Sequence, residues 1–251
     1  MSINSVISKL QKLNNNNLVK VFVPSANKIM EFTQLSVKQQ KELIKTGLDG
    51  AISGVTISNI MSQIILDNSV DQYDFLTVDK FPIILALRKV SFGDNVKVKD
   101  NDKEITFNLS EILEKNLTFD DDFSKTLSFK EEELEISLSV PSLKVDIKAN
   151  EQQISSFKKN KDAEISDTVG SLFIFEIAKF VNKVKVGGEE MDLTSLQFKD
   201  RVSVIESIPA YLNNKILDYI QSFRKTEMEY VTVNDEILPV DARLFAKETD
   251  K

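Results

Sequence analysis

Histidine, cysteine and tryptophan are all absent from the 251 residues of this chain. Without histidine there is no side chain whose ordinary pKa lies near neutrality, and no imidazole to bind a transition metal. Without cysteine the chain can form neither a thiolate nucleophile, nor a disulfide, nor the usual zinc site. Composition therefore excludes Ser–His–Asp and Cys–His catalysis. An enzyme would have to use carboxylates, Lys or Tyr, or an oxygen-ligated magnesium or calcium ion.

The bulk composition is typical of a folded protein that is not built to bind phosphate. Apolar residues make up 41% of the chain and charged residues 28%, which is enough for an ordinary core. A net charge of −7 argues against a nucleic-acid surface. The longest apolar stretch, residues 81–87, is far short of the roughly 20 residues that cross a bilayer. We therefore expect no nucleic acid, membrane, cofactor, metal ion or small-molecule substrate as a partner.

The first 35 residues contain the signals of one helix and one hairpin. Apolar residues from Ile3 to Leu13 recur at helical spacing and predict a short amphipathic helix, which the asparagines from Asn14 onward should end. Strand-like runs at 18–23 and 29–32 flank the turn sequence 24–27. This pattern predicts a β-hairpin.

A helical segment is predicted over residues 36–92. Ser36 and Gln39 have the spacing of a capping box, in which each side chain satisfies a free N–H of the other residue. Gly47, Gly50 and Gly54 then interrupt the helical pattern. Each glycine inside a helix lowers its stability by about 1 kcal/mol relative to alanine. Two explanations fit these glycines: close approach of a neighbouring helix, which we favour, and a break between two helices.

Two further helices are predicted before residue 93. Apolar residues at 57, 60, 61, 64 and 65 form a clean helical stripe. Asp79 is placed to cap the next helix, residues 81–90, with Pro82 in the first turn and Gly93 at the end.

The pattern changes to alternation over residues 93–150, which predicts a β-rich module with one buried face. The acidic clusters 120–122 and 131–133 lie within it, but neither has the spacing of an EF-hand, so solvated turns are the favoured interpretation. The alternating stretches are residues 96–98, 105–107, 134–138 and 145–147.

Residues 165–251 again read as mainly helical. An apolar helix is predicted over 172–181, and Gly187-Gly188 should break the chain. Further helices are predicted to begin at Phe198 and at Pro209, and two strand-like pieces, 230–233 and 236–238, follow.

The expected fold is therefore α+β. Residues 1–35 supply a helix and a hairpin, and the helical segments 36–92 and 165–251 pack together with the β-rich insertion 93–150 between them in sequence. No carboxylate pair stands out as catalytic. The glycine-rich stretch 47–54 lacks the Gly-Lys-Ser/Thr of a phosphate loop.

Two stretches carry a family resemblance: residues 35–43, LSVKQQKEL, and residues 76–94, LTVDKFPIILALRKVSFGD. With them the chain resembles the baseplate hub subunits and hub assembly proteins of T4-like contractile-tailed bacteriophages. The likeness covers most of the first 110 residues and, loosely, residues 165–225. Relatives often carry cysteine pairs just after the Gly-Asp, whereas residues 96–103 contain no sulfur. Packing alone should therefore hold this hairpin.

The resemblance implies a protein that is not an enzyme. It would act in baseplate hub assembly, as a minor structural component or as a chaperone, by contacts with other hub and tail proteins. Its place would be the virion tail baseplate, or the host cytoplasm during assembly. Arg88, Ser91 and Asp94 are the candidate partner-binding residues; alternatively, Arg88 only complements the dipole at a helix C-terminus.

Two other classes of function stay open. A metal-dependent hydrolase could use carboxylates and a divalent cation. An acidic inhibitor of a host protein would need acidic residues spread over one convex face, whereas the clusters 120–122 and 131–133 are local.

Overall fold

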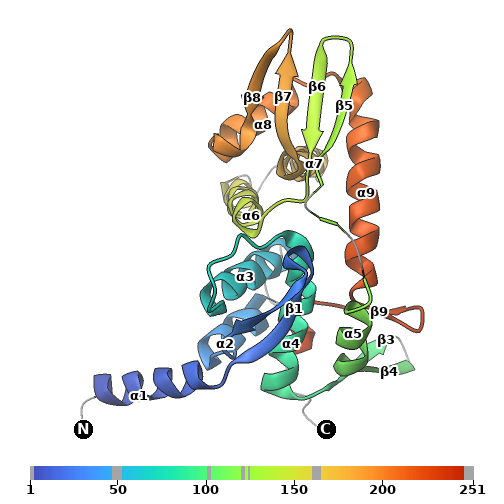
Figure 1. The fold of residues 1–251 in the computed structure, drawn as a ribbon. Helices are drawn as coiled ribbons and strands as arrows, with labels where there is room; N and C mark the ends of the chain where they lie inside the picture. Colours follow the sequence, from blue (N-terminus) through green and yellow to red (C-terminus); the bar gives the residue numbers. More distant parts are fainter. Residues whose placement is uncertain are drawn as a thin grey trace. The chain divides into compact units, whose positions relative to one another are not determined.

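The computed structural model describes residues 3–46, 53–100, 103–119, 122–123, 125–159 and 165–245 (Figure 1). The chain forms two compact units. The first unit comprises residues 1–73, 79–120 and 228–251, and the second comprises 74–78 and 121–227. Both units combine α-helices with small antiparallel sheets, which confirms the α+β class.

The N-terminal part of the first unit has the predicted helix and hairpin. Helix α1 is Ile3–Asn16, and strands β1, Val19–Val23, and β2, Lys28–Phe32, form an antiparallel pair. A short 3-10 turn, Pro24–Ala26, joins the two strands. The predicted end of the helix at Asn14 is wrong, because α1 continues through the asparagines to Asn16.

Helices α2, Val37–Thr46, and α3, Ser53–Asn68, follow the hairpin. The capping box at the start of α2 is confirmed. The Ser36 N–H donates to Gln39 Oε1 at 2.9 Å, and the Gln39 N–H donates to Ser36 Oγ at 3.2 Å. Gln39 Nε2 also donates to Asn68 Oδ1 at 2.6 Å, so the cap of α2 is joined to the end of α3.

The three glycines of this region are only partly described. Gly47 and Gly50 lie outside the described residues. Gly54 lies in the first turn of α3, and a Cβ atom added there would meet nothing within 4 Å. Close approach of a neighbouring helix therefore does not explain Gly54.

Helix α4, Lys80–Phe92, is the buried centre of the first unit, with residues 82–88 all buried. It ends at Gly93, whose φ of 95° suits glycine, as predicted. The predicted cap by the Asp79 side chain is wrong, because Asp79 itself has helical φ and ψ angles and a capping residue needs an extended conformation. The buried Asp79 carboxylate instead accepts from Ser25 N at 2.8 Å and Ser25 Oγ at 2.5 Å.

The first unit is completed by strands β3, Asn95–Asp100, and β4, Lys103–Asn108, by helix α5, Leu109–Asn116, and by the C-terminal segment. That segment has strands β9, Thr232–Val233, and β10, Glu236–Ile237, and the 3-10 helix η6, Ala242–Phe245. Val96 and Phe107 pair across β3 and β4, and both are buried. Apolar packing thus contributes to this sulfur-free hairpin.

The second unit contains a four-stranded antiparallel sheet in the order β5-β6-β7-β8. The strands are β5, Leu127–Glu131, β6, Leu134–Leu138, β7, Val181–Val186, and β8, Glu189–Asp192. Its helices are α6, Leu143–Lys159, α7, Ile165–Phe180, α8, Phe198–Glu206, and α9, Asn213–Glu229. The 3-10 turn Ala210–Leu212 separates Pro209 from the start of α9.

The two faces of this sheet differ in chemistry. The register aligns Phe129, Ile136, Val184 and Met191 in one row across all four strands, with Ile136 and Val184 buried. The neighbouring row on the opposite face alternates in charge from strand to strand. Its members are Lys130, Glu135, Lys185 and Glu190.

Two predictions about the second unit are wrong. Residues 145–147 lie within α6 and are not a strand, since buried Asp146, Ala149, Asn150 and Gln153 continue the pattern at helical spacing. The apolar helix α7 stops at Phe180, and Gly187-Gly188 is the turn of the β7–β8 hairpin rather than a simple break. Both glycines have positive φ, 57° and 92°, as a tight hairpin turn requires.

A buried ion pair joins helices α6 and α7. Lys179 Nζ lies 2.9 Å from Asp146 Oδ1 and 3.2 Å from Asn150 Oδ1. Burial opposes the charged amine, but the carboxylates of Asp146 and Glu176 outweigh it and raise the pKa of Lys179. Lys179 is therefore charged at neutral pH.

The same network reaches α9. Glu176 Oε2 lies 3.2 Å from Lys179 Nζ, and Glu176 Oε1 pairs with the guanidinium of Arg224. Arg224 also donates to Glu227 Oε2 at 2.7 Å. Burial would raise the pKa of Glu176, but Lys179 and Arg224 outweigh it and lower that pKa. Three helices are thus held by alternating charges.

Arg201 of α8 closes the C-terminal end of α7. Its Nη2 donates to the carbonyl oxygen of Lys179 at 3.1 Å and to that of Val181. These carbonyls lie where the helix ends, so they lack helical partners. Burial lowers the pKa of Arg201 to about 10.

Ser36→Ala should lower the free energy of unfolding by about 0.5–2 kcal/mol, the usual cost of losing an N-cap. Urea unfolding followed by far-UV circular dichroism measures this change. Ser8→Ala, at an exposed position of α1, is the control and should change nothing. Equal stability of both variants would show that the capping box does not support α2.

Lys179→Met should lower the free energy of unfolding by about 3–5 kcal/mol, because it removes the ammonium group that neutralises the buried Asp146 carboxylate. The matched control is Lys183→Met, which removes an exposed lysine of β7 that pairs with Glu190 at 3.0 Å. The control should be nearly neutral. The same urea titration compares the two, and a neutral Lys179 variant would contradict the role of the network.

Candidate partner-binding surfaces

Arg88, the first of the predicted binding residues, is turned into the first unit. It is buried, with 7% of its surface exposed. Its Nε donates to the carbonyl oxygen of Leu244 at 3.1 Å, and its Nη1 donates to that of Gly93. Arg88 therefore ties η6 to the end of α4, a structural role that its position in the sequence did not reveal.

Asp94 and Ser91 lie at the same end of α4. The Asp94 carboxylate accepts from Ser110 N at 2.9 Å and from Ser110 Oγ at 2.8 Å, so it fixes the first turn of α5. About a third of its side chain, 36%, is exposed beside Lys89. The Ser91 Oγ is buried without a hydrogen-bond partner. The structure thus brings the three residues together, and their role in binding a partner stays a prediction.

A groove of about 250 Å³ lies next to this cluster, between the β1–β2 hairpin and helices α4 and α5. We call it the hairpin groove. Lys89 and Ser110, which both contact Asp94, line it. The lining residues are Lys20, Val21, Phe22, Ile29, Pro82, Ala86, Lys89, Ser110, Leu113, Glu114, Asn116 and Leu117.

The chemistry of the hairpin groove suits an apolar segment of a protein. Most of its lining is aliphatic or aromatic, and its charged residues are Lys20, Lys89 and Glu114. Ile29 and Leu117, both in the lining, are 64% and 55% exposed, so they give the groove apolar surface that is open to solvent. Sequence reasoning missed the groove because three segments distant in the chain form it.

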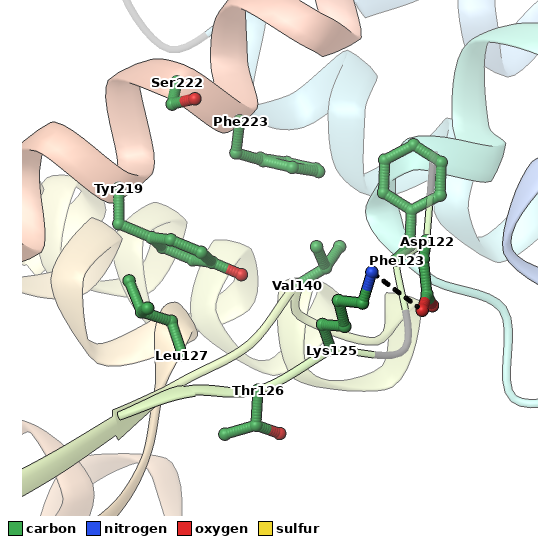
Figure 2. Close-up of a pocket in the computed structure, with 9 residues that line it drawn as sticks. All are labelled: Asp122, Phe123, Lys125, Thr126, Leu127, Val140, Tyr219, Ser222 and Phe223. Atoms are coloured by element: carbon green, nitrogen blue, oxygen red, sulfur yellow. Dashed lines mark ion pairs between the residues drawn. The ribbon is translucent and has the colours of Figure 1, made fainter. Parts of the chain in front are cut away.

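A second groove, of about 330 Å³, lies in the second unit (Figure 2). Tyr219 and Phe223 of α9 and Leu127 of β5 give it an apolar wall, and the ion pair between Lys125 and Asp122, 3.3 Å long, stands on another side. Burial raises the pKa of Tyr219, which therefore keeps its phenol proton at neutral pH. The groove offers aromatic surface and the hydroxyl groups of Thr126, Tyr219 and Ser222.

The acidic clusters do not assemble into a site. Glu131 pairs with Lys215 at 2.6 Å, and Glu132 lies in a turn with φ of 53°. Asp122 pairs with Lys125, while residues 120–121 lie outside the described residues. Among the side chains that the structure describes, no three acidic groups are placed to hold a metal ion. Over the same part of the chain, every helix is too short or too polar to cross a membrane.

Comparison with known families identifies the class of protein. The family described as T4 bacteriophage base plate protein matches residues 16–236 of the 251. Because the match covers most of both units, the chain belongs to the T4 bacteriophage base plate protein family. No curated protein and no solved structure matches the chain.

The family membership confirms the resemblance carried by residues 35–43 and 76–94. The protein is thus a structural protein of the phage baseplate, located in the tail, and it interacts with other baseplate proteins.

Arg88→Met should lower the free energy of unfolding by about 3 kcal/mol, because two carbonyl groups lose a charged donor. Lys89→Met, at the neighbouring and more exposed position, should cost clearly less. Urea unfolding of both variants makes the comparison. An Arg88 variant as stable as the wild type would show that η6 is held by other contacts.

Proposed function

We propose that this protein acts in assembly of the baseplate hub, as a minor structural component or as a chaperone of other hub proteins. It acts by protein–protein contacts and without catalysis. The observation that carries the proposal is the family match over residues 16–236. Composition supports it, because a chain without histidine and cysteine lacks the imidazole base and the thiolate nucleophile.

The hairpin groove is the surface that we assign to this role. Its occupant would be an apolar segment of another hub protein, lying against Val21, Phe22 and Leu113. Ile29 and Leu117 would be covered on binding, which removes exposed apolar surface from water. Asp94 would contribute from the neighbouring cluster, since it orients Ser110 and contacts Lys89 in the lining.

A phage whose gene for this chain carries an early stop codon should accumulate heads and tail fibres but lack complete hubs and sheathed tails. Electron microscopy of infected cells detects this outcome, and a plasmid copy of the wild-type gene should restore tails. A copy with Ile29→Glu and Leu117→Glu should not restore them, because two charges in an apolar groove block docking.

The control is a copy with Val37→Glu and Ile237→Glu. These positions are 82% and 55% exposed in the same unit and lie outside the groove, and the copy should restore tails. Asp94→Ala in the same assay tests the predicted cluster. Normal tails from the stop-codon phage would contradict the hub role. If the two double variants restored tails equally well, the assignment of the hairpin groove as the binding surface would be wrong.

A further inference from the structure

Helix α1 presents an apolar stripe to solvent. Ile3, Val6 and Ile7 lie at helical spacing on one face, and they are 78%, 40% and 47% exposed. Among the described residues, no other helix or strand packs extensively along α1. An amphipathic helix normally buries such a stripe against another element, and here its apolar face is uncovered.

The charge of α1 is opposite to that of the rest of the chain. The helix contains Lys9 and Lys12 and no acidic residue, whereas the whole chain carries a net charge of −7. A basic helix on an acidic protein is complementary to an acidic surface of a partner. Such a partner would be attracted to α1 and repelled by the rest of the chain. Charge therefore indicates an acidic partner.

The family match gives a second, independent indication. It begins at residue 16, which is the last residue of α1. The exposed side chains Ile3, Val6 and Ile7 therefore lie outside the part of the chain that matches the family. The described side chains Ile3, Val6 and Ile7 stay exposed in this unit, so they are suited to binding another protein.

A protein groove fits these observations better than a lipid surface. Helices that lie on membranes generally carry many basic residues on one face and large aromatic or leucine side chains on the other. Helix α1 has two lysines and no aromatic residue, and the acidic remainder of the chain would be repelled by anionic lipids. Anchors at i, i+3 and i+4 are typical of a helix that lies in a groove.

We infer that α1 is a docking helix for another baseplate protein, and that it inserts Ile3, Val6 and Ile7 into an apolar groove with an acidic rim. This inference rests on the proposed function, since it specifies how the protein joins its partners. The interface would be separate from the hairpin groove, because none of the α1 side chains that the structure describes lines that groove.

The experiment uses baseplate precursor particles purified from cells infected with the stop-codon phage. Purified full-length protein is titrated onto these particles, and bound protein is measured after sedimentation. Ile3→Gln/Ile7→Gln should weaken binding at least about tenfold, because each buried isoleucine contributes more than one factor of ten. Glutamine keeps the helix propensity.

The matched control is Asn4→Gln/Ser8→Gln, which introduces the same residue at the adjacent exposed positions and should bind like the wild type. Lys9→Glu should weaken binding severalfold, and raising the salt concentration should weaken wild-type binding. Equal thermal midpoints of all variants confirm that the two units fold. Circular dichroism confirms that the variants keep their helix content.

Three results would overturn the inference. Equal binding by the stripe variant and its control would show that α1 is not part of the binding interface, and it would leave the proposed function intact. Concentration-dependent dimerisation that the stripe variant abolishes would assign the helix to a second copy of this chain. Stripe-dependent binding to vesicles of phosphatidylethanolamine and phosphatidylglycerol would assign it to a membrane. Failure of the wild-type protein to bind the particles would instead contradict the proposed function.

Discussion

Lys179 lies where three helices of the second unit meet, and its ammonium group must be paired there because water does not reach it. Asp146 from α6 and Glu176 from its own helix supply the negative charge, and Arg224 of α9 extends the alternation. Removing one member of such a network costs more than forming it gains, since the remaining charge stays buried. The packing of α6, α7 and α9 in the second unit is therefore expected to depend on Lys179.

In the first unit, buried charged side chains also join segments that are distant in the sequence, and they do so by hydrogen bonds. Arg88 donates hydrogen bonds to carbonyl groups of η6 and of the end of α4, and the Asp79 carboxylate accepts hydrogen bonds from Ser25 of the hairpin turn. A chain with no cysteine cannot join distant segments by a disulfide or a zinc–thiolate site. Buried polar side chains join them here, and we propose that the exposed apolar residues of the hairpin groove and of α1 bind partners.

Local features of the fold could be predicted from the sequence. The capping box of Ser36 and Gln39 and the hairpin turn at 24–27 depend on residues that are neighbours in the chain, so their patterns are self-contained. The stretch 145–147 misled because two apolar residues flanking a polar one satisfy strand alternation over three residues. Only the longer pattern over α6 reveals the helix.

The candidate site could not be predicted in the same way. The sequence placed Arg88 and Asp94 at the C-terminal end of a helix, but it did not reveal that Arg88 reaches a carbonyl group 156 residues away. The hairpin groove combines three separate segments, and its shape exists only after they pack. The apolar periodicity of α1 was visible in the sequence, whereas the exposure of Ile3, Val6 and Ile7 is a property of the fold.

Quantitative mass spectrometry of purified baseplate precursors and of mature virions tests the central claim most directly. The account predicts that this chain is present in the precursors in a fixed ratio to the hub proteins. Its retention in virions would indicate a structural component, and its loss would indicate a chaperone. Absence of the chain from the precursors would contradict the claim that it works by binding hub proteins.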